Sequence, residues 1–294
     1  MFLTLSTPAM ARKSVPAILG AEIALWAPAL CLVVFLIAHF TLFGLAETLG
    51  EETFLLYSKI AEVVTHLFAL FAILEKNVEG LREQIVLSTV ISVVFHAVEN
   101  FQGNEIAKPW HTLDRAAATG LIVSVFVKFL VHVHHSELLL ILSVGLACAF
   151  PWGNLLASTI VTFILLCVLL LKKSERQPVQ SFLKNVVTLL SFGGTPSNPT
   201  TIVFNKKQGD LLVLALVVDF FAVAAYVVGE VVSGLEHWAH AMWHAFVYVT
   251  LWLVVKVLED ALGTKDEGAG TPTRKDREEF VSLLPRTREW LLAF

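Results

Sequence analysis

Residues 236–257 read EHWAHAMWHAFVYVTLWLVVKV, a stretch long and apolar enough to cross a lipid bilayer as one helix. His240 and His244 stand four residues apart in its first half, so on a helix they project from the same face. Two histidines in this arrangement can bind one metal ion. Because ionisable side chains are costly inside a membrane, both are candidate functional residues.

The composition of the whole chain agrees with a membrane location. Of 294 residues, 56% are hydrophobic and only 16% are charged, compared with roughly 25% charged residues in soluble domains. We therefore expect an all-α, polytopic membrane helical bundle with the lipid bilayer as its surroundings. The net charge of −4 is small and the basic residues form no stripe, which argues against a nucleic-acid partner. The three cysteines lie in apolar stretches and predict no disulfide framework.

Eight apolar segments are predicted to span the membrane. Pro151-Trp152-Gly153 favours a tight turn between a short fifth span and the sixth, although one kinked helix over 137–171 is the alternative. The first span follows basic residues, as a signal peptide would, but its apolar run of about 25 residues favours a retained anchor. The spans are 19–44, 54–75, 84–101, 114–133, 137–150, 153–171, 211–232 and 236–257.

The distribution of lysine and arginine predicts the orientation. With the N-terminus inside, the inner segments carry most of these residues, whereas the outer loops carry Lys108, with Arg115 at a helix mouth. Both termini are therefore expected in the cytosol, in a secretory-pathway or plasma membrane. We expect residues 1–50 to form a tail and extra anchor, 51–260 the core, and 261–294 a cytosolic tail. The polar segment 174–209 is expected to be a flexible inner loop.

Polar residues from three predicted spans fall at one depth near the outer side of the membrane. Ser92 and His96 share a face of the third span, Asp114 opens the fourth, and His240 and His244 occupy the first turns of the eighth. Counting residues from the span ends therefore predicts that these five side chains form one layer.

This set of residues indicates a particular chemistry. Catalytic zinc sites commonly use three protein ligands and one water, and His96, His240 and His244 would supply the three ligands. Zinc makes water nucleophilic at neutral pH. Asp114 would take the proton of that water and later give it to the leaving group, and Ser92 would hydrogen-bond the water or the developing oxyanion. We therefore expect hydrolysis of an ester or amide bond, with a membrane lipid as the substrate.

Other polar residues within the predicted spans are expected to have structural roles or to lie outside the set of metal ligands. Lys59, Glu62 and His66 share one face, where Lys59 and Glu62 are expected to form a neutralising pair that supports the ligands from outside. Asp219 lies in the middle of the seventh span, where it needs a partner or a proton. A structural role is expected for His39 and His66, and His132, His134 and His135 are not expected to bind metal. His237 could support a ligand or be a fourth one and is left outside the ligand set. Glu99 could orient His96 or face the outer water, and Glu230 could line the pocket.

The same motifs resemble those of the CREST superfamily of seven-span membrane proteins. Ser92-Val-Val-Phe-His96, Asp114 and His240-x-x-x-His244 match its serine–histidine, aspartate and paired-histidine positions over a core of about 200 residues. The resemblance implies a seven-span core over 54–257, preceded by one additional N-terminal span. The superfamily takes in alkaline ceramidases, adiponectin and progestin receptors, GPI-remodelling lipases and myomaker. Phe95-His-Ala-Val-Glu-Asn100 is most similar to the myomaker and GPI-phospholipase branch, with Val98 where that branch usually has cysteine.

The resemblance implies a zinc ion held by His96, His240 and His244, with Asp114 and Ser92 beside the water. It supports a zinc-dependent hydrolase of a ceramide-like or GPI/phospholipid-like lipid. Because some members of the superfamily are receptors or fusion factors, the alternative is a non-hydrolytic, myomaker- or receptor-like protein with structural zinc.

Overall fold

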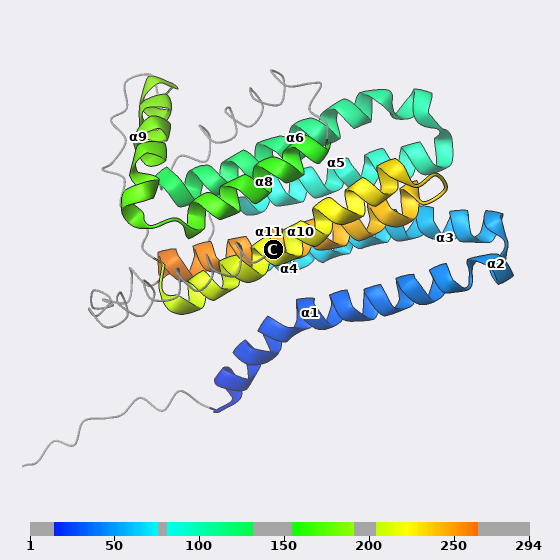
Figure 1. Ribbon diagram of the computed structural model, residues 1–294, viewed down its shortest axis with the longest axis horizontal. Helices are drawn as coiled ribbons and strands as arrows, with labels where there is room; N and C mark the ends of the chain where they lie inside the picture. The colour runs from blue at the N-terminus through cyan, green and yellow to red at the C-terminus, as the bar shows by residue number, and fades with distance from the viewer. Residues whose placement is uncertain (1–14, 76–80, 132–154, 191–203, 264–294) are drawn as a thin grey trace, which may run out of the picture.

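The computed structural model describes residues 15–75, 81–131, 155–190 and 204–263 as a bundle of helices, with no strand in these ranges (Figure 1). This confirms the predicted all-α class. The elements are α1 (Val15–Gly44), α2 (Ala46–Leu49), α3 (Glu51–Val64), the 3-10 helix η1 (Thr65–Phe68), α4 (Ala69–Ile73), α5 (Leu81–Gln102), α6 (Asn104–Val131), α8 (Leu155–Leu170), α9 (Lys173–Leu190), α10 (Lys206–Val231) and α11 (Glu236–Gly263).

Five described helical segments are long and apolar enough to cross a membrane: Trp26–Gly44, Glu51–Ile73, Leu81–Gln102, Lys206–Val231 and Glu236–Ala261. They correspond to the first, second, third, seventh and eighth predicted spans. The fourth overlaps α6, which is not among these five segments, and the sixth overlaps the shorter α8. The fifth, with the Pro151 turn, lies outside the described residues, as do His132, His134 and His135. Many large apolar side chains on these helices face outward, among them Leu67, Leu87 and Phe220, as expected of an integral membrane protein.

The helix α11 lies at the centre of the bundle. It packs against α10 along an antiparallel hairpin and also contacts α1, α3, α4 and α6. Gly229 of α10 lies so close to α11 that a Cβ atom there would be 3.2 Å from the Cβ atom of Ala239. Because neighbouring helices surround it, α11 can carry polar side chains without exposing them to lipid.

Three helix connections gather at one end of the bundle, which we call the turn end: residues 45–50, Gly103 and residues 232–235 (Figure 1). Gly103 and Gly234 have φ angles of +98° and +86°, a conformation that glycine adopts at little cost. The first turns of α3, α6 and α11 and the last turns of α5 and α10 therefore meet at this end. The sequence predicts that this end faces the exoplasmic side.

The N-terminal helix α1 is attached to the core through a buried histidine. The Nε2 atom of His39 lies 2.8 Å from the backbone oxygen of Trp238, and its Nδ1 atom lies 3.0 Å from the hydroxyl of Tyr57. Its ring also stacks on that of Trp238, with centroids 4.8 Å apart. The structural role expected for His39 agrees with these contacts, since both ring nitrogens have partners.

Two predicted boundaries were wrong. Residues 173–190, expected to belong to a loop, form α9, which runs across the bundle rather than along it (Figure 1). Apolar residues recur at 179, 182, 183, 186 and 187, a helical period that low overall hydropathy concealed. The helix α6 also begins ten residues before the predicted fourth span, because Asn104–Leu113 is helical although polar.

Candidate metal centre

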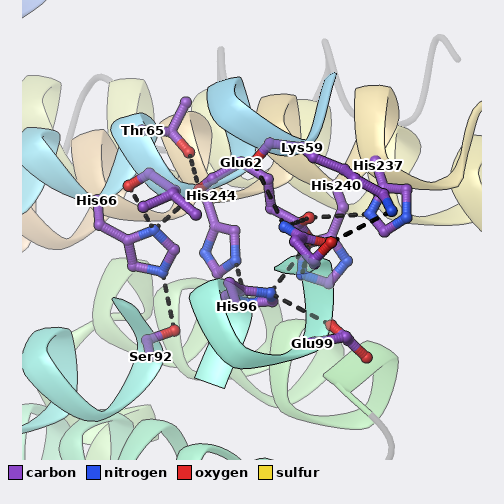
Figure 2. A network of polar contacts seen from close by, with 12 residues as sticks. Lys59, Glu62, Thr65, His66, Ser92, His96, Glu99, His237, His240 and His244 are labelled. Carbon is purple, nitrogen blue, oxygen red and sulfur yellow. Dashed lines mark hydrogen bonds and ion pairs between the residues drawn. The ribbon is translucent and has the colours of Figure 1, made fainter. Parts of the chain in front are cut away.

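Four side chains from three helices converge near the turn end. Glu62 comes from α3, His96 from α5, and His240 and His244 from successive turns of α11 (Figure 2). One potential ligand atom from each lies within 4.8 Å of those of the other three. Glu62, His96 and His244 are buried and His240 is partly buried. This buried group could bind a metal ion.

The three histidine rings form a closed triangle. Their centroids are 4.8 Å apart for His96 and His244, 5.0 Å for His96 and His240, and 4.7 Å for His240 and His244. The Nε2 atoms of His96 and His244 face each other at 2.9 Å, and the Nε2 atom of His240 has no hydrogen-bond partner among the described residues. The first two nitrogens share one hydrogen bond, and a bound cation would replace its proton between the two rings. The unpaired nitrogen of His240 beside them fits a cation site, because buried ring nitrogens usually have partners.

The carboxylate of Glu62 connects the histidines to each other. Its Oε2 atom accepts a hydrogen bond from Nδ2 of Asn100 at 2.8 Å and lies 2.9 Å from Nδ1 of His237. Its Oε1 atom is 3.2 Å from Nδ1 of His96 and 3.8 Å from Nε2 of His240. Oε2 of Glu99 lies 3.6 Å from the same Nδ1 atom (Figure 2). Since His96 presents its other nitrogen to His244, the two carboxylates are placed to fix its ring orientation, as carboxylates do behind metal-binding histidines.

The position of Glu62 behind the ligands agrees with the sequence prediction, whereas its predicted partner does not. The expected pairing with Lys59 is not what the described structure contains, because Lys59 donates from Nζ to the backbone oxygen of Asn100 at 3.3 Å. The same depth count that grouped the other residues could have found Glu62, which lies in the outer half of the second predicted span. His237, likewise left outside the ligand set, contacts Glu62 rather than the three rings.

A second group of polar residues adjoins the histidines. The Nδ1 atom of His66 lies 2.9 Å from the backbone oxygen of Glu62, and its Nε2 atom is 2.8 Å from Oγ of Ser92. Ser92 also lies beside Asp114 and Tyr248, which line the same cavity and interact with it electrostatically. The ring of His66 lies 4.2 Å from that of His244, centroid to centroid. His66 was expected to be structural, and the structure places it in contact with both groups instead.

The local backbone explains how His66 reaches Ser92. Thr65 donates from Oγ1 to the backbone oxygen of Glu62 at 2.9 Å, and His66 contacts the same oxygen. Side chains that hydrogen-bond the preceding carbonyl compete with the α-helical pattern, and the chain forms the 3-10 turn η1 here.

One histidine near the centre stands apart from it. His111 of α6 stacks on Phe95 with centroids 4.9 Å apart and precedes the predicted fourth span. Its partial burial, together with the nearby Arg115, lowers the pKa of His111 below its ordinary value. The lowered pKa favours the neutral form of this ring.

Two cavities reach the centre from different directions. A narrow cavity of about 90 Å³ runs between α5, α6, α8, α10 and α11. Its polar lining includes Ser92, Asp114 and His244 at one level and Asp219 at another, and most of the other lining residues are apolar. A second cavity of about 250 Å³ lies at the turn end and is lined by Glu230, Glu236 and His240 among others. The centre is therefore accessible both from a cavity of apolar character and from a polar one.

Replacing Glu62 by glutamine should weaken metal binding without removing a histidine. The amide keeps the shape of the side chain but loses the negative charge beside His96, and loss of such a partner typically lowers metal affinity about 10- to 100-fold. The measurement is the rate at which a chelator removes metal from the purified protein. Glu236→Gln, an exposed glutamate at the same end, is the matched control. Equal rates for the wild type and Glu62→Gln would contradict the role given to Glu62.

Comparisons of the chain with protein-family models, with curated proteins and with solved structures found no match. The chemistry of the centre therefore rests on its own residues and their geometry.

Proposed function

We propose that this protein is an integral membrane zinc hydrolase, of the kind found in the CREST superfamily, that cleaves an ester or amide bond of a lipid. The observation that carries the proposal is the convergence of His96, His240 and His244 within 4.8 Å, beside the contact between Ser92 and Asp114. A cavity of mostly apolar lining leads from these residues into the bundle.

The donor set favours zinc. Three imidazoles with a nearby carboxylate are typical of zinc sites, whereas calcium and magnesium prefer oxygen ligands. Zinc bound there would polarise the substrate carbonyl and make water nucleophilic at neutral pH.

The arrangement of Glu62 favours an open coordination position. Both of its oxygens already lie close to protein nitrogens, Oε2 to Asn100 and His237 and Oε1 to His96. With Glu62 occupied in this way, three histidines remain as ligands, which is the number that catalytic zinc sites use.

Asp114 and Ser92 would carry the proton and the developing charge. Asp114 is buried and lines the apolar cavity at the level of His244. Its carboxylate would take a proton from the attacking water and return it to the leaving oxygen or nitrogen. Ser92, held by His66 and Tyr248, would hydrogen-bond the oxygen on which negative charge develops.

The two cavities suggest how a lipid would bind. An alkyl chain would occupy the narrow cavity, where lining residues such as Leu121, Ile122 and Leu251 are apolar. The polar part of the lipid would lie toward the cavity lined by Glu230, Glu236 and His240. The scissile bond would then lie between them, at the histidines.

One observation favours the alternative of a non-hydrolytic protein with structural zinc. Oε1 of Glu62 is also 3.8 Å from Nε2 of His240, so a small rotation would make the carboxylate a fourth ligand. A site closed by four protein ligands is typical of structural zinc. The two functions differ in whether the metal-loaded protein turns over a lipid.

Removing the metal tests the proposed function directly. Purified protein is incubated with a ceramide, a phospholipid and a GPI-like lipid before and after chelation, and released fatty acid is measured by mass spectrometry. We expect one of the lipid classes to be hydrolysed, the activity to disappear on chelation, and zinc to restore it. Intact lipid in every reaction of the zinc-loaded protein would favour the structural alternative.

A further inference from the structure

Asp219 is a buried carboxylate in the middle of α10 that the proposed chemistry does not use. Only 1% of its surface is exposed, and its Oδ2 atom has no hydrogen-bond partner among the described residues. It lines the same narrow cavity as His244 and Asp114. A carboxylate oxygen in an apolar environment without a partner is costly, so its position facing a cavity calls for a ligand.

The depth of Asp219 follows from the register of the α10–α11 hairpin. Gly229 lies opposite Ala239, where the two helices are in closest contact. Ten residues further from the turn end, Asp219 is opposite Val249. That level is five residues beyond His244, which at the rise of an α-helix places Asp219 about 7 Å deeper in the bundle than the centre.

A second unpartnered polar atom lies at this depth. Thr250 is adjacent in sequence to Val249, is buried, and lines the same cavity. Its Oγ1 atom, like Oδ2 of Asp219, has no hydrogen-bond partner in the described part of the chain. Two helices thus each present an unsatisfied polar oxygen at one level of an otherwise largely apolar cavity.

We infer that Asp219 and Thr250 form a subsite for a hydrogen-bond donor carried on the lipid chain, a hydroxyl or an amine. An ionised carboxylate only accepts hydrogen bonds, and a threonine hydroxyl accepts as well as donates, so a donor on the ligand can satisfy both oxygens. The donor would sit about six bonds along an extended alkyl chain from the group at His244, given the depth difference of about 7 Å. The inference deepens the proposed function, because it specifies which lipid the centre would take.

Binding of positional isomers tests this subsite without requiring turnover. The probes are octadecanoic acid and its monohydroxy isomers with the hydroxyl at carbons 2, 7 and 12, together with 7-amino-octadecanoic acid. Affinity is measured for zinc-loaded protein in detergent by displacement of a fluorescent fatty acid. We expect the 7-hydroxy or the 7-amino isomer to bind about tenfold more tightly than octadecanoic acid, and the 2- and 12-hydroxy isomers to show no such gain.

Variants assign the preference to the two residues. Asp219→Leu should remove the preference for the 7-substituted isomer while leaving the affinity for octadecanoic acid unchanged or higher. Asp219→Asn keeps an acceptor oxygen and should retain most of the preference for the hydroxy isomer, and Thr250→Val should reduce it. Asp219→Asn and Thr250→Val keep the measurement possible if Asp219→Leu fails to fold.

Equal binding of all positional isomers by the wild type would overturn the inference, and would mean that a part of the protein itself satisfies Asp219. A preference that persists in Asp219→Leu would also overturn it. A position-dependent preference in a protein that hydrolyses no lipid would leave the subsite established and refute only the hydrolytic function. Hydrolysis of lipids by a protein that binds all positional isomers equally would support the hydrolytic function and refute only the subsite.

Discussion

The His244→Ala variant is expected to be purified with less than about one tenth of a zinc ion per chain, compared with about one in the wild type. Removal of one of three histidine ligands leaves two nitrogens, and the remaining site cannot complete the coordination that zinc requires. His244 is the most informative position because its Nε2 atom lies 2.9 Å from that of His96 and its ring also contacts those of His66 and His240. Metal content is measured by elemental analysis after gel filtration in metal-free buffer.

His111→Ala is the matched control. It removes an imidazole from the same end of the bundle, but that ring stacks on Phe95 and lies outside the cluster of potential ligand atoms. This variant should keep one zinc ion per chain. A thermal unfolding curve of each variant, recorded with and without added zinc, separates loss of metal from loss of fold. Addition of zinc should raise the unfolding temperature of the wild type and of His111→Ala but not of His244→Ala. Full zinc occupancy in a folded His244→Ala variant would contradict the proposed centre.

The sequence predicted the helical class and the convergence of the three histidines for the same physical reason. Polar residues are so disfavoured in a bilayer that the few present stand out, and helix length converts residue number into depth. The depth predicted from residue number placed His96 of α5 at the level of His240 and His244 of α11. In the structure the ring of His96 is in contact with both of their rings.

The contacts within that layer could not be predicted, because depth says nothing of rotation about the helix axis. Glu62 was paired with Lys59 by sequence spacing, whereas its carboxylate contacts His96, His237 and Asn100 from other helices. His66 was considered structural because a single histidine in an apolar helix usually is. Its proximity to Ser92 depends on the 3-10 turn at Thr65–Phe68, which has no clear sequence signal.

Hydropathy alone also fails to predict amphipathic helices. The helix α9 is amphipathic rather than apolar, so a search for apolar segments passes over it. Its orientation across the bundle fits a helix at a membrane surface, where one face contacts lipid and the other water.

Asp114→Asn should lower the rate of lipid hydrolysis about a thousandfold while leaving zinc content and unfolding temperature close to those of the wild type. General acid–base groups typically contribute about 10²- to 10⁴-fold to a rate, and asparagine preserves the shape of the side chain but accepts no proton. Asp114 is not among the four potential ligands, so the substitution leaves the metal-binding group intact. The measurement is the initial rate of fatty-acid release by the metal-loaded proteins, with Asp210→Asn, an exposed aspartate at the start of α10, as the control.

The combination of rate and metal content is what distinguishes the two functions. A hydrolase in which Asp114 transfers the proton loses activity and keeps its metal in Asp114→Asn, and loses both in His244→Ala. In a protein with structural zinc, His244→Ala loses metal and stability, whereas Asp114→Asn changes neither metal content nor lipid turnover. Because Asp114 and Ser92 interact beside the same cavity, Ser92→Ala should lower the rate by a smaller factor and add little to the effect of Asp114→Asn, as expected of residues that act as a unit. Unchanged hydrolysis by Asp114→Asn would exclude Asp114 as the proton carrier, even if His244→Ala had confirmed the metal.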